Sequence, residues 1–166
     1  MGCGESLLAA RAAVAISIEA VRAARRVPCA ACLVRPPGHH VARDGKTAVA
    51  PSQGFCLLNS VAVAALEASA NGFERVAVVD FDVHHGNGTE DILARTFDPR
   101  FMYLSLHATG EDVFPGSGRR ARPDHPGVLN APHRAEKVVT TEWVLEEALP
   151  RILNALDAFR PDLLIL

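Results

Sequence analysis

Acidic and histidine side chains are concentrated in residues 80–89 of this sequence. The segment reads Asp-Phe-Asp-Val-His-His-Gly-Asn-Gly-Thr and directly follows the apolar, β-branched run 75–79. Because side chains two residues apart share a face of an extended chain, Asp80, Asp82 and His84 are expected to point the same way. Neighbouring carboxylates repel unless a cation or hydrogen-bond donors lie between them. A carboxylate and an imidazole two residues apart suit zinc or a similar divalent metal, whereas a solvated loop would explain this combination poorly.

The elements that must position these residues are a strand, a turn and a helix. Residues 75–79 are typical of a buried parallel strand. Gly86 and Gly88 would turn the chain, and Thr89 is predicted to cap a short helix that opens with acidic residues. Such a junction is the carboxyl end of a strand in an open α/β sheet, where folds of this class place their sites.

A second candidate group follows another apolar segment. Residues 29–34 are predicted to form a short strand, with Cys29 and Cys32 as small core residues rather than a zinc or redox pair. Two prolines and a glycine in residues 35–38 exclude regular structure there. A stiff loop therefore presents His39 and His40, which we interpret as a catalytic pair.

The rest of the chain alternates between helix and strand patterns. Helices are predicted at 5–25, 59–70 and 140–159, the last kinked near Pro150; strands at 100–106 and from 163; and a long loop at 108–133. This alternation predicts an α/β fold with one mostly parallel sheet and helices on both faces. The 166 residues fit a single domain, or a piece of one.

Composition and charge argue against several classes of protein. Apolar residues make up 49% of the chain and the formal net charge is −2, with acidic and basic residues interspersed. The charge gives no reason to expect direct binding to nucleic acid or to an anionic membrane. No apolar run reaches the ~18 residues of a membrane span, and the amino terminus is not typical of a signal peptide. The four cysteines fit reduced thiols, so we expect a cytoplasmic protein.

Five motifs, in order and at family-like spacing, resemble the zinc-dependent histone deacetylases and their bacterial relatives, nearest the class II and acetylpolyamine amidohydrolase-like branch. They are Arg-Pro-Pro-Gly-His-His at 35–40, Gly-Phe-Cys at 54–56, the 80–89 segment, Ser-Leu-His at 105–107 and Phe-Pro-Gly-Ser-Gly at 114–118. The resemblance covers nearly the whole chain. It implies an arginase/deacetylase-type fold, present here in part, and removal of acetyl or other acyl groups from acetyl-lysine or related acetylated amines.

The resemblance also implies roles for individual residues. Asp82 and His84 match two of the three zinc ligands of the family. The proton-transfer positions of the family are matched by two histidines, each with its partner: His39 with Asp80, and His40 with Asn87. In this chemistry zinc polarises the amide carbonyl and activates a water, one histidine accepts the proton of that water, and an imidazolium protonates the leaving amine.

Substrate and potassium positions follow from the same resemblance. Phe55 and Phe114 match the aromatic walls of the channel for the acetyl-lysine-like chain, and Gly54 belongs to the same substrate-binding motif. A family site for potassium, formed partly by backbone oxygens, is matched by Asp80, Asp82, His84, Ser105 and Leu106.

Two functional positions of the family have no match in the chain. The third zinc ligand is an Asp just after the strand that here begins at Leu163, and the Tyr that polarises the carbonyl lies further on; Tyr103 does not match it. The chain therefore resembles the middle of a family catalytic domain, truncated at both ends. We expect the isolated chain to bind zinc weakly and to hydrolyse acetyl-lysine poorly or not at all. Its last strand is expected at an open sheet edge, which favours self-association.

Two alternatives stay open. A two-metal ureohydrolase of the arginase kind shares the implied fold, but it requires a further Asp two residues after the ligand histidine, where this chain has Gly86. The other alternative is a non-catalytic, truncated deacetylase-fold module that binds a partner. Counting bound metal tests the first alternative, and hydroxamate binding tests the second, because a hydroxamate needs a competent zinc.

Overall fold

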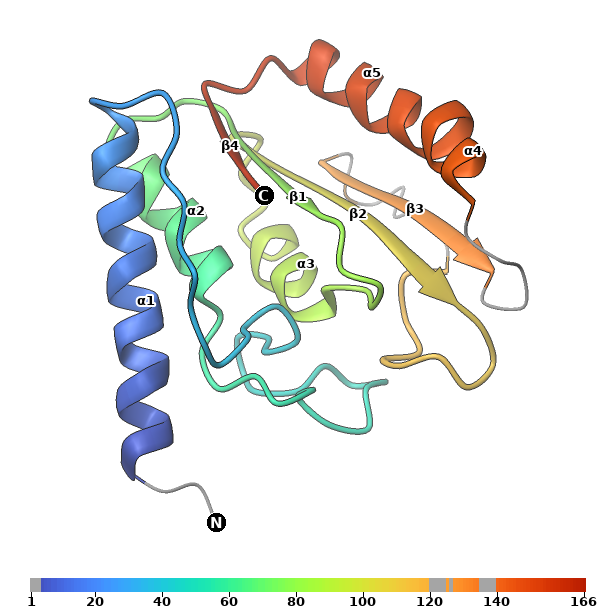
Figure 1. The fold of residues 1–166 in the computed structure, drawn as a ribbon, viewed down its shortest axis with the longest axis horizontal. Helices are drawn as coiled ribbons and strands as arrows, with labels where there is room; N and C mark the ends of the chain where they lie inside the picture. The colour runs from blue at the N-terminus through green and yellow to red at the C-terminus, as the bar shows by residue number, and fades with distance from the viewer. Residues whose placement is uncertain (1–3, 120–124, 126, 135–139) are drawn as a thin grey trace.

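The computed structural model describes residues 4–119, 125, 127–134 and 140–166. Its centre is a four-stranded sheet in which every paired strand is parallel and the order is β3-β2-β1-β4 (Figure 1). The strands are β1 (Val76–Asp80), β2 (Phe101–Thr109), β3 (Val128–Arg134) and β4 (Leu163–Ile165). The predicted parallel α/β architecture is therefore confirmed.

Helices cover both faces of this sheet (Figure 1). On one face lie α1 (Gly4–Ala24), α2 (Ser60–Ala70) and α3 (Asn87–Ala94), with α1 outside α2; on the other lie α4 (Thr141–Trp143), the π-helical η1 (Val144–Ala148) and α5 (Leu149–Phe159). The predicted helices at 5–25 and 59–70 correspond to α1 and α2. The predicted helix at 140–159 corresponds to α4, η1 and α5, and the π-helical η1 ends two residues before Pro150. A kink there stays a prediction.

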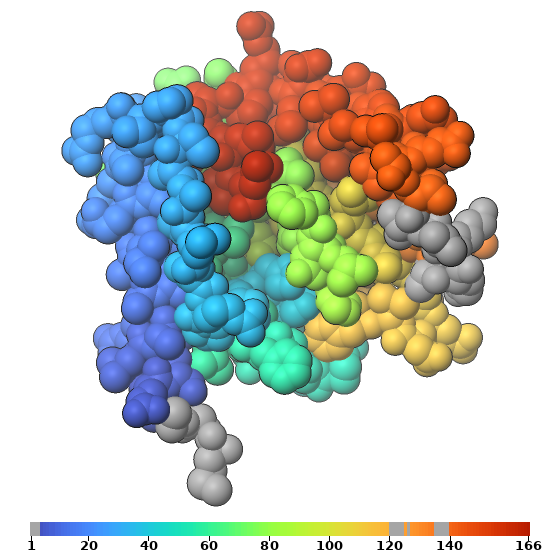
Figure 2. Space-filling view, in the orientation of Figure 1, coloured from blue at the N-terminus to red at the C-terminus, as the bar shows by residue number. Residues whose placement is uncertain are grey.

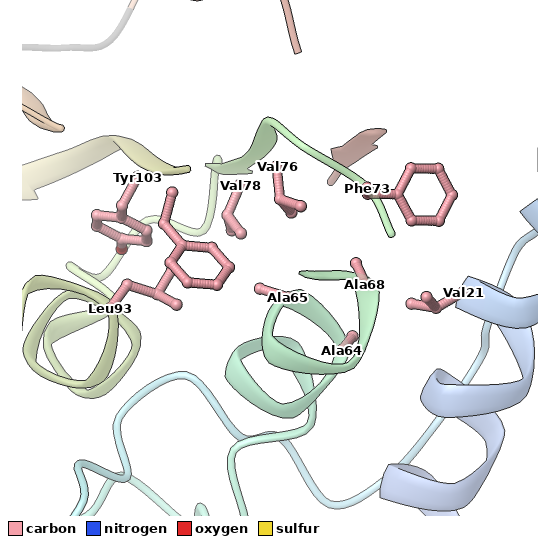
Figure 3. Packing of buried hydrophobic residues seen from close by; sticks show 10 residues of the cluster. Val21, Ala64, Ala65, Ala68, Phe73, Val76, Val78, Leu93 and Tyr103 are labelled. Carbon is pink, nitrogen blue, oxygen red and sulfur yellow. The ribbon is translucent and has the colours of Figure 1, made fainter. Parts of the chain in front are cut away.

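Each face of β1 enters its own core because its side chains alternate. Val76 and Val78 pack against the alanines of α2, and Figure 3 shows those alanines between Val76 and Val21 of α1. Ala77 and Val79 pack instead with Leu104 and Ile152, the latter from α5. A strand that is apolar on both faces is the normal centre of a parallel sheet.

The loop predicted at 108–133 is shorter than expected, because β2 continues to Thr109 and β3 begins at Val128. The sequence does not indicate β3 because the strand contains Asn130, Pro132 and His133, which are not typical of strands. The proline is tolerated because β3 is an edge strand, so one side of its backbone needs no ladder partner.

The strand predicted at 29–34 does not form. This segment runs over the surface beside the carboxyl-terminal strand (Figure 2), and Cys29 is exposed and Cys32 partly exposed, so the prediction of two core cysteines is wrong. A strand needs a neighbour for its backbone hydrogen bonds. Here a cavity of about 310 Å³, lined by Val34, Val61 and Leu166 among others, lies where the segment approaches the sheet.

The strand predicted from residue 163 is β4, at the end of the sheet opposite β3. It pairs with β1 alone among the described strands, through Leu163, Leu164 and Ile165. Leu164 and the following Leu166 are exposed. Within the described parts of the chain, no helix combines the length and apolar character needed to cross a bilayer.

Candidate active site

The acidic cluster lies at the carboxyl end of β1, where the chain leaves the sheet in two tight turns. The Asp82 backbone N–H donates to Asp80 Oδ1 (3.1 Å), and the His84 N–H donates to Asp82 Oδ1 (2.8 Å). Short acidic side chains commonly close such turns on the backbone two residues on. The strand ends at Asp80, close to the predicted end at residue 79, so residues 80–84 are not the extended chain assumed for a shared face. The turns nevertheless keep Asp82 and His84 together, with His84 Nδ1 3.3 Å from Asp82 Oδ1.

Both predicted histidines are oriented by the partners assigned to them. His39 Nδ1 lies 2.9 Å from Asp80 Oδ2, and His40 Nδ1 lies 2.8 Å from Asn87 Oδ1. The Asn87 amide is fixed in turn, since its Nδ2 donates to Thr47 Oγ1 (2.6 Å). An ionised carboxylate and an amide oxygen can only accept, so Nδ1 carries the proton in both rings and Nε2 is the atom directed away from these partners.

The loop that carries the histidines is attached to the start of α3. The backbone N–H groups of Gly88 and Thr89 both donate to the His39 carbonyl oxygen, at 2.9 and 3.0 Å. Gly86 is the N-cap residue of α3, and no side chain caps the helix there. The prediction that Thr89 caps this helix is therefore wrong, because Thr89 lies inside α3, where its hydroxyl contacts Asn59.

The pKa values of the two histidines are shifted in opposite directions. Burial would lower the pKa of His39, but the hydrogen bond to Asp80 and the charges of Asp80 and Asp82 outweigh it and raise that pKa. For Asp80, burial opposes ionisation, yet the hydrogen bond and charge of His39 lower its pKa. Burial and the neighbouring His39 charge lower the pKa of His40. The environment thus moves the two pKa values apart, upward for His39 and downward for His40, and such a difference between neighbouring groups is typical of acid–base pairs.

Phe114 closes one side of this group. Its ring lies edge-on to His40, with centroids 4.7 Å apart, and 5.9 Å from the His84 ring, while the His40 and His84 rings are 6.0 Å apart. Gly54 lies against the same rings: a Cβ added there would come within 2.3 Å of His40 Cδ2 and 3.1 Å of Phe114 Cε1. The structure thus brings together His40, His84, Phe114 and Gly54.

Phe55 is placed differently from Phe114. Its side chain is 92% exposed, and its φ of 65° lies in the left-handed region that a phenylalanine rarely adopts. Among the described residues its ring makes no ring–ring contact. Its role as a channel wall stays a prediction.

Tyr103 supports the site from the middle of β2, a role that the sequence did not indicate. Its hydroxyl lies 3.2 Å from Asp80 Oδ2 and 3.1 Å from the Gly86 carbonyl oxygen and can donate to either. Burial, followed by the charge of Asp80, raises its pKa well above the usual value, so it remains a neutral donor. The available signal was the alternation of Tyr103, Ser105 and His107, which places all three on one face of the strand.

Of the five predicted potassium positions, two are register partners in the sheet. Asp80 of β1 lies opposite Ser105 of β2, and Leu106 follows. The Ser105 hydroxyl contacts His107 Nδ1 at 2.8 Å. The assignment of potassium to this edge stays a prediction.

The donor chemistry of Asp82 and His84 fits two positions of a zinc site. A carboxylate and an imidazole are normal zinc ligands, and both side chains are about half exposed, at 48% for Asp82 and 44% for His84. Among the residues that the structure describes, no group of three or more His, Cys, Asp or Glu side chains is arranged to hold a metal ion.

His107 gives the site region a measurable pH dependence. Burial and the nearby His85 ring lower its pKa to about 4, against about 6.5 in an unfolded chain. The unfolded state therefore binds more protons between these values, so the free energy of unfolding falls as pH drops from about 6.5 to about 4, by roughly 3 kcal/mol at most. Urea unfolding at a series of pH values should show this loss, and His107→Gln should remove that part of it. Equal acid sensitivity in both proteins would contradict the prediction.

Comparison with known proteins agrees with this architecture. A family model described as the histone deacetylase domain matches residues 1–166. The chain is 40% identical over 145 residues to Type-2 histone deacetylase 2 of Dictyostelium discoideum, covering 81% of this chain and 8% of that protein. It is 37% identical over 166 residues to a probable deacetylase of Methanothermobacter thermautotrophicus, covering 96% of this chain and 47% of that protein.

Two solved structures have the same fold. The HD domain of HDA15 superposes with a TM-score of 0.74 at 32% identity, over 94% of this chain and 44% of that one. An acetylpolyamine aminohydrolase from Burkholderia pseudomallei superposes with a TM-score of 0.73 at 33% identity, over 94% of this chain and 43% of that one. Fold and site thus define an arginase/deacetylase-type α/β domain. The chain belongs to the histone deacetylase family, and it spans less than half the length of these four relatives.

Proposed function

We propose that this chain carries the proton-transfer groups, two metal ligands and one channel wall of a zinc-dependent amidohydrolase that removes acetyl or other acyl groups from acetyl-lysine or related acetylated amines. The observation that carries this proposal is the pair of oriented histidines, His39 on Asp80 and His40 on Asn87, beside His84 and Phe114. The names of the deacetylase and acetylpolyamine relatives support the substrate class.

Zinc, held in part by Asp82 and His84, would supply Lewis-acid polarisation of the amide carbonyl and lower the pKa of water. The histidines do the proton transfer. His40, neutral and fixed through Nδ1, presents Nε2 to accept the proton of the attacking water. His39, whose pKa the hydrogen bond to Asp80 raises, would supply a proton for the leaving amine.

Phe114 is expected to favour an unbranched aliphatic substrate stem. Its ring borders the histidine pair, with the bare backbone of Gly54 beside it. Methylenes of a lysine or polyamine stem packed against such a wall would each contribute about 0.8 kcal/mol. Acetylated lysine in a peptide and an acetylated small amine both meet this requirement.

The glycine at position 86 favours a site for one metal ion over the two-metal site of a ureohydrolase. A Cβ at this position would come within 2.1 Å of Asp80 Oδ2 and 2.5 Å of the Tyr103 hydroxyl. No acidic side chain fits there without moving both groups, so the position cannot hold the additional Asp that a two-metal site requires.

Metal titration and acetate release test the proposed function on residues 1–166. A catalytic zinc usually has three protein ligands, so we expect weak binding of one zinc per chain, lost in Asp82→Ala and His84→Ala and retained in Asp157→Ala, which removes an exposed acid on α5. With an acetyl-lysine peptide or an N-acetylated diamine, acetate release should be slow, zinc-dependent and reduced to the level of zinc alone by His40→Ala.

Three outcomes would contradict parts of this proposal. Rapid turnover with one tightly bound zinc per chain would overturn the expected weakness of the metal site. Two zinc ions per chain would favour the ureohydrolase alternative. Zinc binding at Asp82 and His84 without hydroxamate binding, and without acetate release that depends on His40, would favour the non-catalytic module. Self-association through β4 and a cytoplasmic location stay predictions.

A further inference from the structure

Two buried imidazoles that the proposed reaction does not use lie against Gly118, four residues after Phe114. His85 precedes α3 and His107 is near the end of β2, and their rings are 4.5 Å apart. Both side chains are almost completely buried, at 1% and 2% exposure. Buried imidazoles need hydrogen-bond partners at both nitrogens. The partners of each ring therefore show which parts of the chain the ring connects.

Each imidazole is fixed on one side by the body of the domain. His85 Nε2 donates to Glu90 Oε2 of α3 (2.8 Å), which also accepts from Asn130 Nδ2 of β3 (2.9 Å). His107 Nδ1 lies 2.8 Å from the Ser105 hydroxyl of β2. Neither ring can turn without breaking a buried hydrogen bond, which costs about 1–3 kcal/mol.

On its other side, each imidazole holds the loop that carries Phe114, residues 110–119. His85 Nδ1 lies 2.9 Å from the Ser117 hydroxyl, and His107 Nε2 donates to the Gly118 carbonyl oxygen at 3.1 Å. These two contacts attach adjacent residues of the loop to α3 and to β2. The loop is also closed on itself, since the Gly116 N–H donates to the Val113 carbonyl oxygen.

The close contact between the loop and the two imidazoles requires a glycine at position 118 but not at position 116. Both glycines have positive φ, at 78° and 84°. A Cβ on Gly118 would come within 2.4 Å of His107 Nε2 and 2.7 Å of His85 Cγ, whereas a Cβ on Gly116 would meet nothing within 4 Å. The backbone approaches the imidazoles so closely at residue 118 that only a hydrogen fits there.

We propose that His85 and His107 are positioning residues, which set the Phe114 ring over His40 by holding Ser117 and Gly118. Phe114 is three residues before Ser117, and its ring lies 4.7 Å from that of His40. The significance of that ring position as a substrate wall rests on the proposed function. The positioning itself does not, so it can be tested without zinc and without turnover.

The test uses zinc-free protein and NMR contacts between the ring protons of Phe114 and His40. Wild type should show nuclear Overhauser effects between these rings. Ser117→Ala and Gly118→Ala should lose them and shift the His40 ring resonances, while the amide resonances of β1 and β2 stay in place. Gly116→Ala, which carries the same positive-φ strain without the steric contact, should keep the ring contacts, and so should Ser117→Thr, which keeps the hydroxyl.

Unchanged ring contacts in a folded Ser117→Ala protein would overturn the proposal, as would their loss in both Ser117→Thr and Gly116→Ala. Should Gly118→Ala fail to fold, the serine pair decides the question. Failure of acetate release in the wild-type chain leaves these ring contacts unaffected, so failure of the proposed function and failure of this positioning are distinguishable.

Discussion

Replacing Gly88 with alanine should lower the free energy of unfolding by about 3 kcal/mol, at the upper end of what added volume costs in a packed interior. The new Cβ would lie 2.4 Å from both the carbonyl carbon and oxygen of Val41 and 2.5 Å from the carbonyl carbon of His40. These are backbone atoms, which cannot rotate away as a flexible side chain can. Relief requires that α3 and the histidine loop move apart, which would also break the bonds from Gly88 and Thr89 to the His39 carbonyl oxygen.

Urea denaturation followed by circular dichroism measures this loss. In the interior of a helix, alanine is otherwise favoured over glycine by about 1 kcal/mol, so the expected sign is opposite to that of helix propensity. Gly4→Ala is the matched control, because Gly4 is also helical but an added Cβ there meets nothing within 4 Å. A Gly88→Ala protein as stable as wild type would show that the loop and the helix are not in the described contact.

Removing the Glu90 carboxylate should have a comparable or larger effect. Glu90→Ala leaves His85 Nε2 and Asn130 Nδ2, which both donate to Glu90 Oε2, without that acceptor in a buried place. A buried donor left without its acceptor typically costs about 1–3 kcal/mol, and this substitution leaves two. Glu90→Gln should cost less, because an amide oxygen in the place of Oε2 can still accept from both donors.

The same urea experiment checks that Glu90→Ala loses more stability than Glu90→Gln, with Glu146→Ala as control. Glu146 is an exposed acid of η1, and its removal should change the unfolding free energy by no more than about 0.5 kcal/mol. A loss below about 1 kcal/mol for Glu90→Ala would mean that water replaces the carboxylate and that the cluster is less buried than the structure indicates.

Features that depend on a few consecutive residues could be predicted from the sequence better than contacts between distant segments. The apolar run before Asp80 and the stiff loop before His39 can be recognised from a few consecutive residues, and the structure brings the two segments together. The family resemblance supplied the pairing of His40 with Asn87, which spacing alone does not give. By contrast, the supporting contacts of Tyr103 and His85 depend on how strands and helices pack, so they became visible only with the fold.

The errors have the same physical origin. Residues 29–34 have the composition of a strand, but a strand also needs a neighbouring chain to accept its hydrogen bonds. The segment of β3 contains Pro132, which argues for a loop unless the strand is known to lie at an edge. Thr89 has the side chain of a helix cap, yet the helix already starts at Asn87, with Gly86 as its N-cap.

One short helix, α3, controls more of this centre than its eight residues suggest. Its first backbone amides hold the loop of His39, its Asn87 orients His40, and its Glu90 fixes His85. These three attachments belong to one rigid body, so selection cannot adjust one of them by moving the helix without disturbing the other two. Divergence in substrate preference among chains of this design should therefore accumulate at Gly54 and in the segment around Phe114, while α3 stays constant.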